Sequence, residues 1–120
     1  MVNTTAFLNT VKAGVRTTVL AEGTYVAVGT GSTAADVSDT TLGVEEERNA
    51  RQEYTEGTSD VIISGFITSV QCTGDDLTEV GVLDAAASGD LMMREVFTTI
   101  SKTSSIEIWI DIEQQIDVTQ

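Results

Sequence analysis

The last part of the chain, residues 106–118, alternates between apolar and polar residues with few exceptions. Successive side chains of a β-strand point to opposite faces, so this period of two predicts a strand with one apolar and one solvent-facing side. Half-buried strands of this kind are typical of antiparallel sheets. The apolar parity contains Ile106, Ile108, Ile110, Ile112, Ile116 and Val118, and the polar parity contains Glu107, Asp111, Glu113, Gln115 and Asp117.

The middle of the chain favours the same class of fold. Further apolar runs, separated by turns, predict strands over residues 25–28, 60–70, 77–83 and 91–100, and the small polar residues of 32–41 predict a loop. Both parities of 60–70 are apolar, which predicts a central strand buried on two sides. At 120 residues the chain is expected to form a single mainly β domain, an antiparallel β-sandwich of the jelly-roll or immunoglobulin-like kind.

Two segments depart from this pattern. We expect an N-terminal helical segment over residues 1–20, in which apolar spacing over 4–15 predicts one short helix with Thr4 or Thr5 as its N-cap and Gly14 loosening its end. Residues 43–56 contain helix-forming residues but too few apolar positions for a buried helical stripe. For this second segment we expect an extended arm or a long, largely exposed strand.

Composition argues against several kinds of function. Nineteen acidic against six basic residues give a formal charge of −13, which repels phosphate backbones and predicts no binding to nucleic acid. The chain has no histidine and one cysteine, Cys72, so it lacks the usual general base, a Cys-built zinc site and an internal disulfide. We therefore expect no catalytic residues, no metal and no cofactor, and we expect Cys72 to be a small buried apolar residue.

Three short motifs have simple structural interpretations. Gly29-Thr30-Gly31 lacks the lysine of a phosphate loop and the third glycine of a dinucleotide fold, which favours a tight turn. Asp75-Asp76, beside a glycine, is expected to be solvated charge, with weak calcium binding as the alternative. Lys102 lies in a predicted turn and is expected to be solvated or to form a salt bridge.

No apolar stretch reaches the length of a membrane span, and the N-terminus lacks the features of a signal peptide. We therefore expect a soluble protein that is made in the cytoplasm and has no membrane partner. The surface is acid-rich, and the chain has only two lysines, Lys12 and Lys102. Since salt screens the self-repulsion of such a surface, a halophilic source is a hypothesis, and an ordinary acidic protein is the alternative.

Five residues are candidates for contacts between subunits. Trp109 lies on the polar parity of the terminal strand, so it is covered either by another segment of the chain or by a partner. The arginines are rare cations in an acidic chain and are predicted to pair with carboxylates across subunits. Strand edges unprotected by proline would serve the same assembly. The candidate interface residues are Trp109, Arg48, Arg51, Tyr54 and Arg94.

Three blocks of the sequence together are similar to a known group of proteins. They comprise residues 25–31 with 38–43 and Glu47-Arg48, residues 77–86, and residues 91–94 with 100–105. In this order they resemble small virion structural proteins of tailed bacteriophages and archaeal tailed viruses, and the N-terminal module of phage tail-collar fibre proteins. The resemblance spans most of residues 7–113. Ala87-Ser88-Gly89-Asp90 stands where that pattern has a double glycine.

The resemblance implies a non-enzymatic structural subunit of a tailed virus particle. Such a subunit would be a capsid decoration, turret, collar, or tail or baseplate component, made in the host cytoplasm and located in the virion. It would form a homo-oligomer, either a trimer or a ring of five or six copies, and would contact other virion structural proteins such as capsid or tail subunits. A receptor-binding or carbohydrate-binding fibre-tip module is the alternative.

Overall fold

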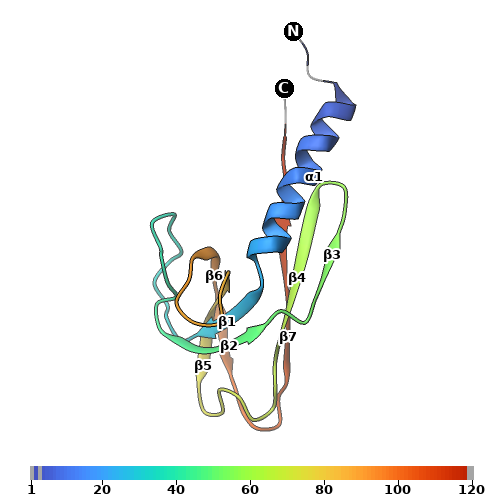
Figure 1. Cartoon of the computed structure of the whole chain (residues 1–120). Coiled ribbons are helices and arrows are strands. Elements are labelled where there is room, and N and C mark those ends of the chain that lie inside the picture. Colours follow the sequence, from blue (N-terminus) through green and yellow to red (C-terminus); the bar gives the residue numbers. More distant parts are fainter. Residues whose placement is uncertain (1, 3, 119–120) are drawn as a thin grey trace.

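The computed structural model of the chain describes Val2 and residues 4–118. It is mainly β, with two antiparallel sheets and one helix, as the sequence predicts (Figure 1). The molecule is elongated and measures 57 × 27 × 25 Å. The elements are α1 (Thr5–Glu22), β1 (Tyr25–Gly29), β2 (Glu45–Ala50), β3 (Glu53–Glu56), β4 (Asp60–Ile67), β5 (Asp76–Leu83), β6 (Leu91–Ser101) and β7 (Ile108–Gln115).

The first sheet has the strand order β2-β1-β5-β6. Its two central strands are apolar on the side that faces the second sheet, and their register places Val26 opposite Val82 and Val28 opposite Val80. All four of these valines are buried. β6 and β2 are the outer strands of this sheet.

The second sheet has the order β3-β4-β7. The two-sided apolar pattern of residues 60–70 correctly predicts that β4 is its central strand, but β4 ends at Ile67. Residues 68–74 form turns instead, and Val70 is exposed. The alternation of the terminal strand is confirmed over β7, where Ile108, Ile110 and Ile112 are partly buried and the residues between them are exposed.

Both sheets contribute to one apolar core. Val26 and Val28 of β1 pack with Ile63 and Ile67 of β4 in this core. At Gly65 a Cβ atom would lie only 2.6 Å from a methyl carbon of Val26, which is closer than packed carbon atoms approach. The glycine therefore allows β1 to lie against β4, as in a sandwich.

Residues 43–56 are extended, as expected, and they supply strands to both sheets. β2 belongs to the first sheet and β3 to the second, and the chain passes between them at Arg51 and Gln52. Backbone hydrogen bonds hold this crossover, because Arg51 N donates to Thr24 O at 2.9 Å and Gln52 N donates to Ser64 O at 2.8 Å. One continuous extended segment thus closes one side of the sandwich.

The N-terminal helix α1 is longer than predicted. Its N-cap is Thr4, whose Oγ1 accepts a hydrogen bond from Phe7 N at 3.2 Å. Thr4 is one of the two N-cap residues that the sequence predicts. The expectation that Gly14 loosens the helix end is wrong, since α1 continues to Glu22. A glycine within a helix costs only about 1 kcal/mol, and Val19 and Leu20 pack against the core beyond it.

Candidate functional site

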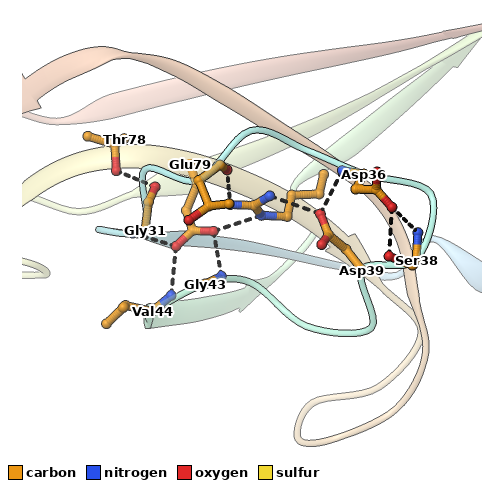
Figure 2. Close-up of polar contacts among 10 residues, drawn as sticks. Gly31, Asp36, Ser38, Asp39, Gly43, Val44, Thr78 and Glu79 are labelled. Atoms are coloured by element: carbon orange, nitrogen blue, oxygen red, sulfur yellow. Dashed lines mark hydrogen bonds and ion pairs between the residues drawn. The ribbon is translucent and has the colours of Figure 1, made fainter.

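A polar cluster surrounds Glu79 of β5 (Figure 2). The Glu79 side chain is fully buried. Its Oε1 accepts hydrogen bonds from Gly43 N at 2.7 Å and Arg94 Nε at 3.0 Å. Its Oε2 accepts from Gly31 N at 2.6 Å and Val44 N at 2.8 Å. Each carboxylate oxygen therefore has two donors.

Arg94 of β6 extends this cluster to the loop of residues 30–44. Besides Glu79, its guanidinium contacts Asp39 Oδ2 at 2.9 Å through Nη1 and Thr33 O at 2.8 Å through Nη2. Only 4% of the Arg94 side chain is exposed. One arginine thus joins β5 and β6 to two positions of this loop, Thr33 and Asp39.

Hydrogen bonding decides the charge of Glu79. Burial, the largest single effect, raises the pKa of this carboxyl, but the backbone N–H groups of Val44, Gly43 and Gly31 together with Arg94 outweigh it, and the net pKa is lowered. The hydrogen bond to Glu79 likewise raises the pKa of Arg94. A carboxylate with a lowered pKa and two donors on each oxygen is suited to holding structure and unsuited to general acid catalysis.

The glycines beside this cluster explain the motif that resembles a phosphate loop. A Cβ atom on Gly31 would lie 2.8 Å from Gly43 Cα and 2.9 Å from Glu79 Cδ, so neither loop segment has room for a side chain there. The backbone N–H groups that a phosphate loop would offer to a ligand are instead donated to Glu79. Both N–H groups are therefore already paired within the chain.

A second feature is an apolar groove between β6 and β7, the outer strands on the same side of the two sheets. The groove has a volume of about 500 Å³. In the described part of the chain, neither strand has a second neighbour in its sheet. The groove is lined by Val28, Leu77, Val80, Phe97, Thr98, Ile100, Ile108, Trp109, Ile110 and Asp111. Unpaired strand edges beside exposed apolar surface are a common site of protein association.

Trp109 stands at this groove with 50% of its surface exposed. Its ring centroid lies 6.2 Å from that of Phe66 on β4, and its Nε1 donates to Asp111 Oδ1 at 2.8 Å. The same oxygen accepts from Ser64 Oγ at 2.6 Å. The indole is therefore held in one orientation while half of it faces solvent. Its role at a subunit interface stays a prediction.

The other candidate interface residues have partners within the chain. Arg48 binds Glu45 at 2.6 Å and the carbonyl oxygens of Ala85 and Ser88 at 2.9 and 2.8 Å. Arg51 donates to the backbone at the end of α1 and lies 4.9 Å from the centre of the half-exposed Tyr54 ring. The contacts of Arg48, Arg51 and Arg94 described here all lie within one chain. The predicted pairing of these arginines across subunits would instead use carboxylates of a second copy. Any such pairing stays a prediction.

The expectation that Lys102 is solvated or forms a salt bridge is wrong, because this side chain is almost fully buried, with 1% exposure, and its Nζ binds carbonyl oxygens. Its Nζ donates to Ser69 O at 3.0 Å and Thr103 O at 2.9 Å, which replaces part of the hydration that burial removes. Backbone hydrogen bonds from Gly74 N to Lys102 O and from Lys102 N to Asp75 O, both 2.9 Å, join this residue to the turn after β4. A turn position in the sequence gives no sign of this burial, because it depends on two distant turns meeting.

Cys72 is partly buried against the apolar core, close to the environment expected for it. Burial, followed by the nearby Asp75, Glu47 and Glu46, raises the pKa of its thiol. A raised pKa leaves less of the reactive thiolate at neutral pH. Within the described residues, no group of three or more His, Cys, Asp or Glu side chains is placed to hold a metal ion.

No known protein family matches the chain, and no curated protein is significantly similar to it. Among the helices of the described residues, none is long and apolar enough to cross a membrane.

Proposed function

We propose that this protein is a non-enzymatic structural subunit of a tailed virus particle, serving as a capsid decoration, turret, collar, or tail or baseplate component. The observation that carries the assembly role is the apolar groove between the outer strands β6 and β7, each of which pairs on one side only within the described residues. The assignment to a virus particle rests on the resemblance of the three sequence blocks to small virion proteins.

The groove supports self-association for a physical reason. Trp109, Ile100 and their neighbours expose apolar surface at a strand edge, where a second chain can gain both apolar burial and backbone hydrogen bonds. Head-to-tail contacts between identical chains can close into rings, and the resemblance to virion proteins implies a trimer or a ring of five or six copies. Other capsid or tail subunits would contact the remaining faces.

Truncation of Trp109 tests this role. We expect Trp109→Ala to weaken self-association by about 2 kcal/mol, since half-exposed tryptophans at the centre of an interface contribute much of its energy. The measurement is the mass of the purified protein by native mass spectrometry across a concentration series. The control is Val70→Ala, another exposed apolar residue, which lies in the turns after β4 and outside the candidate interface set.

An intact oligomer of the Trp109→Ala variant with only a lowered melting temperature would contradict the interface role. A wild-type chain that is monomeric at every concentration would contradict the assembly proposal as a whole. Peptide mass spectrometry of purified virus particles tests the virion assignment independently of both.

A receptor-binding or carbohydrate-binding module is a second proposal, favoured by one observation. The exposed indole of Trp109 is fixed beside the carboxylate of Asp111 on an open sheet face, and such a pair can stack on a sugar ring and accept its hydroxyl hydrogen bonds. A glycan array separates the two proposals. Saturable binding that Trp109→Ala abolishes while oligomer mass is unchanged would favour the second.

A further inference from the structure

The second sheet has one face that lies outside the core. Val61, Ile63 and Ile67 of β4 are buried in the core, so the alternate side chains of this strand point away from the first sheet. The register of the sheet places those side chains beside alternate side chains of β3 and β7. We call this surface the outer face of the second sheet. Its charged and aromatic side chains are Glu53, Asp60, Phe66, Trp109, Asp111 and Glu113.

Every charged side chain on this outer face is acidic. Glu53, Asp111 and Glu113 are exposed, and Asp60 is partly exposed. No lysine or arginine occupies the alternate positions of β3, β4 and β7 that form the face. The local field is therefore negative and favours a cationic partner.

Trp109 and Asp111 together have the geometry of a site for a planar cation. The half-exposed indole is held in place by Phe66 and by the hydrogen bond from its Nε1 to Asp111 Oδ1. Asp111 Oδ1 also accepts from Ser64 Oγ, while Asp111 Oδ2 has no donor among the described residues. A guanidinium group stacks on an indole ring and binds a carboxylate through its N–H groups. A fixed indole beside a free carboxylate oxygen therefore favours arginine.

The spacing along β7 indicates the shape of the partner. Trp109, Asp111 and Glu113 are two residues apart along one strand, which places successive side chains of this face about 6.6 Å from each other. An extended peptide has the same repeat between its own alternate side chains. Two arginines separated by one residue can therefore reach Asp111 and Glu113 together.

A second copy of the chain has no free cation to offer this face. Each of the six basic side chains already binds a carboxylate, a hydroxyl or a carbonyl oxygen of its own chain. Two chains with a formal charge of −13 each also repel one another. The cations that complement the outer face must therefore come from a different protein.

We propose that the outer face of the second sheet binds an extended, arginine-rich segment of another protein. One arginine stacks on Trp109 and pairs with Asp111, and the next alternate arginine pairs with Glu113. The inference goes beyond the proposed assembly function, because it names a second partner and does not require self-association.

Trp109 is the only tryptophan in the chain, so its fluorescence and its indole N–H signal in NMR report on this face alone. The probe is an acetylated and amidated peptide of sequence TRTRT. Its control is the same peptide with both arginines replaced by citrulline, which has a similar shape and no charge. At about 0.05 M KCl, where screening is weak, we expect TRTRT to change both signals saturably and the citrulline peptide to leave them unchanged.

Two double variants with equal net charge separate this site from general attraction to an acidic protein. Asp111→Asn with Glu113→Gln removes two carboxylates of the face, and the asparagine can still accept from Trp109 and Ser64 through Oδ1. The control is Glu22→Gln with Asp90→Asn, at exposed positions outside the second sheet. We expect the first pair to raise the Kd for TRTRT at least about fivefold and the control to leave it within about twofold.

Three results would overturn the inference: no binding of TRTRT, equal binding of the citrulline peptide, or an equal Kd in the two double variants. A glycan that binds saturably where TRTRT does not would assign the face to carbohydrate instead. The proposed assembly is judged separately, by the oligomer mass of Trp109→Ala. A monomeric wild type that binds TRTRT would refute the assembly and support the arginine site.

Discussion

At the scale of single residues, Glu79 is the clearest case of a buried charge that is stabilised by hydrogen-bond donors around it. Three backbone N–H groups and Arg94 supply four donors to its two oxygens. The contacts span residues from 31 to 94, so the carboxylate joins the loop of residues 30–44 to two strands. Removing its charge leaves donors unpaired in a buried site, where each unpaired group is costly.

Glu79→Gln should therefore destabilise the protein by about 3 kcal/mol, since an amide nitrogen cannot accept the hydrogen bonds that one oxygen accepts. Chemical denaturation at neutral pH measures this loss. The control is Glu107→Gln, an exposed position outside the strands, for which we expect little change. Similar stability of the two variants would show that the cluster is not important for the fold.

The lowered pKa of Glu79 also predicts how stability depends on pH. The folded state binds the proton of this group less readily than the unfolded state does. Its contribution is therefore fully present above the unfolded pKa of about 4.3 and is lost as pH falls through the lower folded value. Below about pH 4.3, stability should fall more steeply in wild type than in Glu79→Gln. Equal slopes of the free energy of unfolding against pH in the two proteins would contradict this prediction.

At the scale of elements, α1 depends on its cap and on its second half. Thr4 satisfies one of the free N–H groups at the start of the helix, and Val19 and Leu20 attach its end to the core. The first half has little packing within the chain. Local changes there should alter the helix more than they alter the sandwich.

Thr4→Ala should reduce the stability of the first helical turns by about 1 kcal/mol through the loss of the capping hydrogen bond. Hydrogen exchange of the amides of residues 7–10 measures this, and amides of β1 and β5 serve as the internal control. Thr4→Ser should retain protection, because serine caps equally well. Equal protection in Thr4→Ala and wild type would contradict the capping role.

At the scale of the whole molecule, charge is the dominant feature. The formal charge of −13 is spread over a surface with few cations, and several of those cations are paired within the chain. Both the folded chain and any assembly of copies must overcome the repulsion of the remaining acids. Salt reduces that repulsion by screening it.

If the protein is adapted to high salt, its melting temperature should rise steeply between about 0.05 and 3 M KCl. The reason is that added salt screens the repulsion between the surface carboxylates. A variant with Glu107→Gln, Glu113→Gln and Asp117→Asn should show a weaker salt dependence, because it removes three exposed acids. A flat response of the wild type would remove the halophilic hypothesis.

Much of the fold was predictable from local pattern. The alternation in β7, the two-sided apolar character of β4 and the N-cap at Thr4 depend on neighbouring residues in the chain, which the sequence displays directly. The end of β4 at Ile67, the continuation of α1 past Gly14 and the division of residues 43–56 between two sheets were not predictable. Each depends on packing against residues distant in the sequence.

In the candidate site, too, local features were predictable from the sequence and contacts between distant residues were not. The sequence determined the β class, the acidic charge and the exposed parity of Trp109, because periodicity and composition are properties of the chain itself. An acid at position 79 within an apolar strand could have indicated a buried partner. Only the tertiary structure decided that Arg94 is that partner, that Lys102 is buried and that β6 and β7 border an open groove. Those features require segments far apart in sequence to meet, and their meeting is fixed by the packing of the two sheets.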